Sequence, residues 1–243
     1  MSFNHLLEEA RQAHERYAAH RASCEDPGCE SCKDFRCVKC KTKSEALSSF
    51  HRMCPTCERT RRHRELAKSI PLAFDAASLD AAWLQKLVTP AFVEEARKSL
   101  GDLRCTFAGP AGSGKTSLAI AMMRAAIAIC NVDRDSFLYA SAHELAKARS
   151  TSRLGEEPEV VERALRCGLL VVDELGGEDE RYGSAVSEII YERHAWQRAT
   201  WITTGVNSER LGQRYGGGIV RRISEGATIF KMGEKVSRPG VKP

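Results

Sequence analysis

The sequence predicts an α/β fold with a parallel sheet covered by helices on both faces, and three observations predict it. From Leu103 onward, short apolar segments alternate with helical segments, as in a doubly covered parallel sheet. The first apolar segment runs directly into a glycine-rich turn, and the third ends in two carboxylates. Both features would lie where the carboxyl ends of parallel strands meet, which is the edge at which such sheets bind ligands.

Length and composition exclude several classes of protein. A chain of 243 residues with 42% hydrophobic content can form one large domain, or a medium domain with a small attachment. No segment approaches the roughly 18 apolar residues of a membrane span. The N-terminal segment is charged throughout, unlike a signal peptide, so we expect a cytoplasmic protein with no membrane partner. The net charge of +5 permits nucleic acid as a partner without requiring it.

The N-terminal part of the chain combines a helix with a cysteine-rich segment. Residues 3–22 place apolar side chains at three- and four-residue spacing, which predicts an amphipathic helix. Seven of the ten cysteines then follow between Cys24 and Cys57. C-x-x-C spacing in a protein of the cytoplasm favours metal binding over disulfides. The other three cysteines, Cys105, Cys130 and Cys167, lie in or beside apolar segments, and we expect them in the core.

Four of the clustered cysteines have the spacing of a tetrahedral zinc site. Cys37 and Cys40 form one pair, and the pair Cys54 and Cys57 follows after thirteen residues. A four-thiolate site is coordinatively closed, so its expected role is to hold together a segment too small to form its own core. The remaining members of the cluster could form a second zinc site with His20, or the start of an iron–sulfur spacing: Cys24, Cys29 and Cys32.

A basic run and a proline mark the end of this region. The positive residues of the run could bind a phosphate backbone or form a solvated helix face: Arg59, Arg61, Arg62, His63 and Arg64. Ile70-Pro71 breaks the pattern, so we predict an N-terminal domain over 1–68 and a second domain over 69–234. Residues 71–101 are predicted to be a connector containing a helix from about Pro90 to Leu100.

The turn after the first apolar segment is a phosphate-binding loop. Gly109, Gly114, Lys115 and Thr116 match G-x-x-x-x-G-K-[ST], with a strand before the loop and a helix after it. Backbone N–H groups of the loop and the helix N-terminus then point to one anion site. Lysine here reaches the β- and γ-phosphates, and the threonine hydroxyl ligates Mg²⁺. We expect nucleotide to contact the whole loop: Gly109, Pro110, Ala111, Gly112, Ser113, Gly114, Lys115, Thr116 and Ser117.

The next elements lead to the acidic strand. A helix extends from the loop to about Cys130, and a strand over 136–140, a helix over 142–149, an exposed loop over 150–158 and a helix from Glu159 follow. The apolar run 169–172 predicts a buried strand that ends at Asp173 and Glu174. Asp173 could hold Mg²⁺, and Glu174 could polarise the attacking water as general base.

The last third of the chain supplies a sensor position and two arginines. A helix is predicted over 183–198 and a buried strand over 200–204, at whose end a polar residue could sense the γ-phosphate. Arg221 and Arg222 follow on a helix after a glycine run. A strand over 228–232 and a disordered basic tail over 235–243 complete the prediction.

Taken together, these motifs resemble AAA+ ATPases of the replicative-helicase-loader group (DnaC and DnaI type) and the related IS21 transposition helpers (IstB type). The resemblance covers residues 68–234 and is carried by three segments. They are GPAGSGKTSLA at 109–119, LLVVDELGG at 169–177 and WITTGVNSERLGQRYGGGIVRRISEG at 201–226. It implies an AAA+ P-loop core without a helical lid, and slow ATP hydrolysis stimulated by DNA or by oligomerisation.

The resemblance also assigns roles to individual residues. Lys115 and Thr116 match the Walker A pair, and Asp173 and Glu174 match the Walker B pair. Arg222, or Arg221 if the register is shifted by one, matches the arginine finger that completes the site of a neighbouring subunit in a ring or spiral. The family usually has Thr-Thr-Asn after the strand, whereas this chain has Gly205 at the third position, so Asn207 or Thr204 would have to replace the sensor asparagine.

The N-terminal region decides between the two branches of the resemblance. Some loader relatives carry a cysteine-rich zinc segment before an Ile-Pro connector, whereas the transposition helpers resemble a cysteine-poor helical N-terminus. We therefore expect a loader that binds the replicative helicase through residues 1–68 and places it on single-stranded DNA with ATP, Mg²⁺ and Zn²⁺. The alternatives are an IstB-like transposition helper on double-stranded DNA, and a zinc adaptor with a non-hydrolysing nucleotide switch.

Overall fold

The computed structural model describes residues 70–129, 137–153, 155–182, 185–233 and 235–237. Of the first 69 residues it describes Lys39, Cys40, Cys57, Thr60, Arg61 and Arg64. The predicted N-terminal helix and most of the predicted zinc ligands therefore lie outside the described residues. Cys40 is exposed and Cys57 is half-buried. The zinc-binding N-terminal domain stays a prediction.

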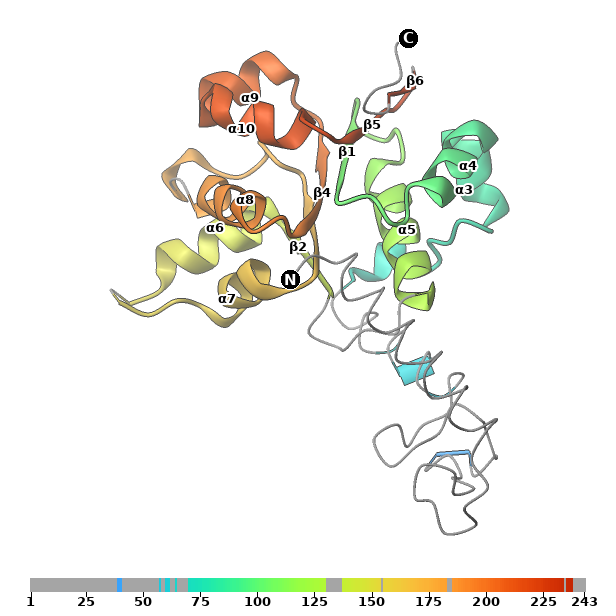
Figure 1. Ribbon diagram of the computed structural model, residues 1–243, viewed down its shortest axis with the longest axis horizontal. Coiled ribbons are helices and arrows are strands. Elements are labelled where there is room, and N and C mark those ends of the chain that lie inside the picture. The colour runs from blue at the N-terminus through green and yellow to red at the C-terminus, as the bar shows by residue number, and fades with distance from the viewer. Residues whose placement is uncertain are drawn as a thin grey trace, which may run out of the picture.

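A six-stranded sheet with the order β2-β3-β4-β1-β5-β6 forms the centre of the fold (Figure 1). Its strands are β1 (Arg104–Ala108), β2 (Phe137–Ser141), β3 (Leu169–Asp173), β4 (Ala199–Thr204), β5 (Thr228–Lys231) and β6 (Lys235–Ser237). Neighbours among the first five strands pair in parallel, and β6 pairs antiparallel to β5. The predicted parallel sheet is confirmed. Its register aligns Ala108 with Thr204 and Ser141 with Asp173, so the carboxyl ends of the strands form one edge.

Helices cover both faces of the sheet, as Figure 1 shows. One face carries α3 (Ala82–Val88), α4 (Pro90–Lys98) and α5 (Lys115–Ile129). The other carries α6 (Ala142–Thr151), α7 (Glu159–Arg166), α8 (Ala185–Ala195), α9 (Ser208–Tyr215) and α10 (Gly217–Ser224). Two short 3₁₀ helices, η2 (Leu72–Phe74) and η4 (Glu180–Tyr182), lie in the connections. After β5 the described residues contain only β6, so no helical lid is present among them.

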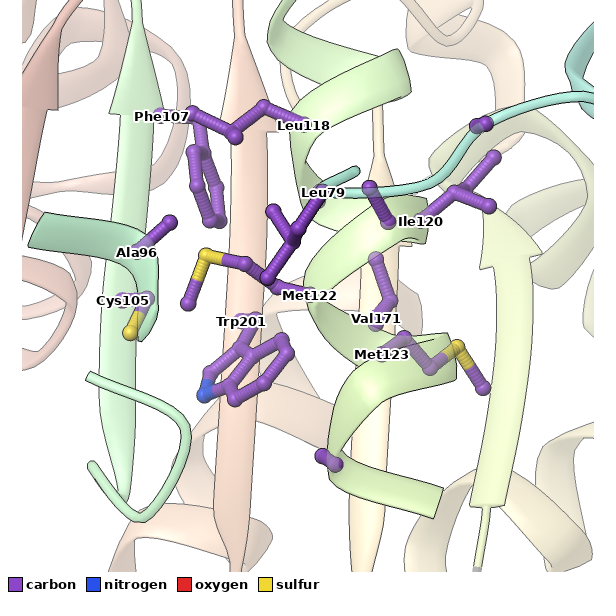
Figure 2. Packing of buried hydrophobic residues seen from close by; sticks show 14 of the residues in the cluster. Leu79, Ala96, Cys105, Phe107, Leu118, Ile120, Met122, Met123, Val171 and Trp201 are labelled. Carbon is purple, nitrogen blue, oxygen red and sulfur yellow. The ribbon is translucent and has the colours of Figure 1, made fainter. Parts of the chain in front are cut away.

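A buried hydrophobic core lies between α5 and the sheet. Side chains of α5, among them Leu118 and Met122, lie against Phe107, Val171 and Trp201 of three strands (Figure 2). All five are at most 1% exposed. Because α5 is apolar on several sides and begins directly at the phosphate-binding loop, its burial holds that loop in place. Cys105 and Cys167 are buried in the core, as predicted.

Two segments differ from the sequence prediction. Residues 71–101, predicted as a connector with one helix, contain two helices, α3 and α4, and bury Leu79, Leu84 and Val88 in the same core as α5. Residues 235–237, predicted as part of a disordered tail, form β6 on the outer side of β5. The physical reason is that an edge strand offers unpaired backbone groups to any segment that can reach it.

None of the helices in the described residues combines the length and the apolar character that crossing a bilayer would need.

Candidate nucleotide-binding site

The phosphate-binding loop joins β1 to α5 at the carboxyl edge of the sheet. Gly112 and Gly114 have φ angles of +76° and +86°, a region that glycine enters without steric cost. A Cβ atom on Gly114 would lie 2.7 Å from Cγ1 of Val88, so α3 packs directly on the loop. The helix N-terminus and the backbone of the loop therefore face the same space, as the sequence predicts.

A cavity of about 630 Å³ opens beside this loop. That volume is within the range of sites for nucleotide-sized ligands. Its lining combines loop residues with residues of four other segments: Phe74, Leu87, Ala111, Gly112, Gly114, Lys115, Thr116, Ser117, Glu174, Leu175, Gly177, Gly205 and Val206. Glu174 and the loop are thus neighbours in space although about sixty residues separate them in the sequence.

Asp173 is bound by three hydroxyl groups. The hydroxyls of Thr116 and Thr203 donate to its Oδ1 over 2.8 Å and 2.5 Å, and the hydroxyl of Tyr139 donates to its Oδ2 over 2.7 Å. The carboxylate is 5% exposed. Burial raises the pKa of Tyr139, and the neighbouring Asp173 adds to the shift, so the phenol stays protonated and donates. These three bonds hold the carboxylate beside the hydroxyl of Thr116.

Glu174 projects from a strained turn just after β3. Its φ angle is +57°, and its backbone N–H donates to Oγ1 of Thr203 over 2.9 Å. Its carbonyl oxygen accepts from the N–H of Gly177 over 2.9 Å. The side chain is exposed and lines the cavity. The turn therefore separates the two acids, since Asp173 is buried among hydroxyls whereas Glu174 faces the open cavity.

The loop offers donors that fit a phosphate group. Nζ of Lys115 donates to the carbonyl oxygen of Pro110 over 2.7 Å. Burial lowers the pKa of Lys115, and the carboxylates of Asp173 and Glu174 act in the opposite direction. Oγ of Ser113 is buried and has no hydrogen-bond partner among the described residues, which is unusual for a buried hydroxyl. Thr116 and Asp173 supply the oxygen ligands that Mg²⁺ prefers, so the residues fit nucleotide together with Mg²⁺.

The position after β4 at which the family usually has a sensor asparagine is Gly205 in this chain. Gly205 lines the cavity directly after β4. Oδ1 of Asn207 accepts from the N–H of Arg210 over 2.9 Å, so Asn207 caps the N-terminus of α9 and is not among the residues that line the cavity. The hydroxyl of Thr204 donates to the carbonyl oxygen of Leu175 over 2.7 Å and is buried. Both candidate replacements are thus engaged in local hydrogen bonds.

Arg222 lies on α10, outside the residues that line the cavity. Its guanidinium stacks on the ring of Tyr191 at 4.1 Å, and its Nη1 donates to the carbonyl oxygen of Gly218 over 3.0 Å. Arg222 and Arg104 line the same small hollow, and Arg104 begins β1. That hollow includes no residue of the phosphate-binding loop, and Arg222 is not among the residues that line the nucleotide cavity. Arg221 is exposed and pairs with Glu225 at 3.6 Å.

No metal centre is found in the part of the chain that the structure describes. There, no group of three or more His, Cys, Asp or Glu side chains is arranged to hold a metal ion. Cys24, Cys29, Cys32, Cys37 and Cys54 lie outside the described residues, so both predicted zinc sites stay predictions.

Several residues of the site were not predicted from the sequence. Phe74 and Leu87 line the cavity from the segment predicted as a connector, while Tyr139 and Thr203 bind Asp173 from the two strands beside β3. Tyr139 and Thr203 lie beside Asp173 because of the order of the strands, which no local motif encodes. The apolar spacing of residues 84, 88, 92 and 96 is a signal that could have indicated the packed helices near Leu87.

Comparison with known proteins agrees with this geometry. Among solved structures, the DnaC helicase loader matches with a TM-score of 0.55 at 22% sequence identity, covering 67% of this chain and 99% of that chain. The structure of DnaI matches with a TM-score of 0.53 at 19% identity, covering 68% of this chain and 93% of that chain. At these identities the likeness concerns the fold, which is the AAA+ P-loop type. No curated protein matches the sequence. The sequence profile of the IstB-like ATP binding proteins matches residues 52–219, more than half of the chain, and the chain belongs to this family.

Proposed function

We propose that this protein is an ATPase and that ATP with Mg²⁺ binds in the cavity beside the phosphate-binding loop. The observation that carries the proposal is the position of Glu174, which faces the cavity while Asp173 stays buried against Thr116. One carboxylate is available to a water molecule, and the other is available to a metal ion. This division of roles is the one that phosphoryl transfer to water requires.

In this proposal the residues of the cavity have different roles in hydrolysis. Lys115 and the backbone N–H groups of the loop bind the β- and γ-phosphates, and Glu174 orients the attacking water and accepts its proton. Thr116 and Asp173 hold Mg²⁺, which neutralises charge on the phosphate oxygens when it is bound. Phe74 and Leu87 provide apolar surface in the lining of the cavity.

Arg222 completes the site of a second copy of the chain in this proposal. The position of Arg222 outside the lining of its own chain's cavity supports this, because an arginine finger acts on nucleotide held by a neighbouring subunit. Hydrolysis then depends on self-association into a ring or spiral, in which Arg222 acts as an arginine finger.

Two substitutions test the ATPase proposal. Lys115→Ala should abolish nucleotide binding, because it removes the cation that reaches the phosphates. Glu174→Gln should keep binding and stop turnover, because the amide cannot accept the proton of the water. Binding of a fluorescent ATP analogue and release of phosphate are measured on the full chain. Normal turnover in Glu174→Gln would remove this residue as the base.

We further propose that the ATPase is a replicative-helicase loader that acts on single-stranded DNA in the cytoplasm. The likeness of its fold to the DnaC helicase loader and the cysteine-rich segment before residue 68 support this role. Residues 1–68 then bind the helicase, and a zinc ion on Cys37, Cys40, Cys54 and Cys57 organises them.

Co-purification with the replicative helicase of the same host tests the loader proposal. The full chain is mixed with helicase and ATP, and Cys54→Ser serves as the variant that breaks the zinc site. A complex that forms with the natural chain and is lost in Cys54→Ser is the expected result. No complex with the natural chain would contradict the loader proposal.

Two other functions each have one observation in their favour. The match to the IstB-like family favours a transposition helper, which would form filaments on double-stranded DNA and bind no helicase. The glycine at position 205 favours a zinc adaptor whose nucleotide site acts as a switch, which would bind ATP without DNA-stimulated turnover. Electron microscopy with duplex DNA and the turnover assay above distinguish these functions from the loader.

A further inference from the structure

A buried glutamate lies four residues after the proposed catalytic base. Glu178 is 3% exposed, and its side chain contacts Gly176 of the loop after β3 and two residues of α9. Its Oε1 accepts from the hydroxyl of Tyr215, and its Oε1 lies 3.6 Å from Nη2 of Arg214. We call Glu178, Arg214 and Tyr215 the Glu178 cluster. A buried carboxylate is stable only when its lone pairs are satisfied, and this one has partners on both oxygens.

The second oxygen of Glu178 holds the loop that carries Glu174. Oε2 accepts from the backbone N–H of Gly176 over 3.0 Å, and the carbonyl oxygen of Glu174 accepts from the N–H of Gly177 in the same turn. The carboxylate of Glu178 is therefore bonded to the backbone two residues after the proposed base. The side of the turn that faces β4 is held separately, by the bond from the N–H of Glu174 to Thr203.

The other side of the cluster belongs to α9. Arg214 donates to the carbonyl oxygen of Glu178, and its guanidinium packs on the ring of Tyr215 at 5.3 Å. Both residues stand in the last turn of α9. A Cβ atom on Gly176 would lie 2.8 Å from Cγ2 of Val206 and 3.1 Å from Cδ2 of Leu211, so the loop already touches the start of α9. The Glu178 cluster adds a polar contact at the end of the same helix.

We propose that Glu178 is a positioning residue, which sets the direction of Glu174 by binding the loop after β3 to Arg214 and Tyr215 of α9. The inference rests on the proposed ATPase function. It gives a role to the Arg-Tyr-Gly segment at 214–216, which the nucleotide site itself does not use. Glu174 sits in a left-handed backbone conformation, which persists only where its surroundings hold it, and Glu178 provides part of that hold.

Tyr215→Phe is the sharpest test, because it removes one hydroxyl and keeps the ring beside Arg214. Glu178 then loses a buried donor, and the loop gains freedom. We expect kcat for ATP to fall about 10- to 100-fold, the size of effect that a small misplacement of a catalytic group produces. KM and nucleotide affinity should not change, because the phosphate-binding loop is untouched. A fall in kcat with an unchanged KM distinguishes a positioning role from a general loss of fold.

Glu180→Gln is the matched control in the same segment. Glu180 is two residues away, its side chain is 87% exposed, and it lies 3.8 Å from Nη1 of Arg214. Because exposed pairs contribute little, this variant should behave like the natural chain. Glu178→Gln keeps one acceptor for the N–H of Gly176, so it should retain more turnover than Glu178→Ala.

Hydrogen exchange of the amides at 174–178, measured on the full chain, provides a readout that needs no turnover. Tyr215→Phe should speed exchange in this segment and leave 110–117 unchanged. If the natural chain hydrolyses ATP, either an unchanged kcat or an unchanged exchange rate in Tyr215→Phe overturns the inference and leaves the ATPase proposal standing. If the natural chain does not hydrolyse ATP, the ATPase proposal fails. The exchange measurement then still tests the link between Glu178 and the loop. Unchanged exchange of residues 174–178 in Tyr215→Phe overturns that link, and faster exchange supports it.

Discussion

The hydroxyl of Tyr139 donates a 2.7 Å hydrogen bond to Oδ2 of Asp173 from the neighbouring strand. Tyr139 is 7% exposed and stands two residues before the end of β2. Because Thr116 and Thr203 donate to Oδ1, the phenol occupies the one oxygen that the threonines leave available. A carboxylate held on both oxygens cannot rotate, and fixed ligand orientation is what a hydrogen-bonded outer layer contributes to a metal site.

Tyr139→Phe should therefore weaken the response to Mg²⁺. Loss of an outer partner of a metal ligand costs about 10- to 100-fold in metal affinity. The measurement is the Mg²⁺ concentration that gives half-maximal ATP binding. Affinity in EDTA should stay as in the natural chain. The matched control is Tyr182→Phe, which removes a tyrosine hydroxyl and keeps the ring that packs edge-on against His143. An identical Mg²⁺ response in Tyr139→Phe and Tyr182→Phe would contradict this role.

Gly205→Asn should raise ATP turnover. A Cβ atom on Gly205 would meet only the carbonyl oxygen of Gly109, at 3.8 Å, so there is room for a side chain at this position of the cavity lining. An amide at this point can hydrogen-bond the γ-phosphate or the attacking water, and orienting donors of this kind raise kcat. Phosphate release by the variant and by the natural chain is compared at saturating ATP.

Gly176→Ala is the contrast for Gly205→Asn. Its Cβ would lie 2.8 Å from Val206, and its φ angle is +92°, so the fold itself should lose stability. A Gly205→Asn variant that is as unstable as Gly176→Ala would show that the space beside Gly205 is not available.

Arg193→Ala should destabilise the fold without affecting the cavity directly. Arg193 is 0% exposed and donates to the carbonyl oxygens of Ala164, Cys167 and Ala199, which end α7 and begin β4. Leaving these buried acceptors without a donor should lower the free energy of unfolding by about 2–5 kcal/mol. Urea denaturation measures the loss.

Arg149→Ala is the control for the loss of an arginine. Arg149 pairs with Glu157 and Glu188 at the surface, and such pairs are worth about 0–1 kcal/mol. Equal losses of stability in the two variants would contradict the role given to Arg193.

Mixing two inactive variants should restore ATP turnover if Arg222 acts on a second copy. Arg222→Ala keeps the nucleotide cavity, whereas Lys115→Ala keeps the arginine on α10. In a mixed assembly some cavities of the first variant face an intact Arg222. Turnover is measured as one variant is titrated into the other. If the mixture stays inactive although both variants assemble, Arg222 does not complete a neighbouring site.

The metal content of the full chain tests how many zinc sites the cysteine-rich segment forms. One equivalent of zinc is expected if Cys37, Cys40, Cys54 and Cys57 form the only site. Two equivalents would bring in Cys24, Cys29 and Cys32. Chelation should unfold this segment and spare ATP binding, because bound metal supplies the folding energy of small zinc modules. A chain purified without zinc in a zinc-containing medium would contradict both sites.

Much of the site was predictable because its motifs are local. The loop at 109–116 needs glycine at turn positions and lysine and threonine at a helix start, and all of these lie within eight residues. The pair Asp173 and Glu174 follows a four-residue apolar run, which is typical of a buried strand. The alternation of strands and helices then predicted the parallel sheet, which the structure confirms.

The rest of the site depends on the order of the strands and on packing between distant segments. Backbone conformation and hydrophobic period are local properties, so the sequence alone predicts that a phosphate-binding loop and two acids meet at one edge of a parallel sheet. The packing of distant segments was needed to show that Tyr139 and Thr203 hold Asp173, that Glu178 meets Tyr215, and that residues 71–101 pack into the core. These contacts join residues far apart in the chain, and each forms because a buried polar or apolar group must find a partner wherever the fold brings one.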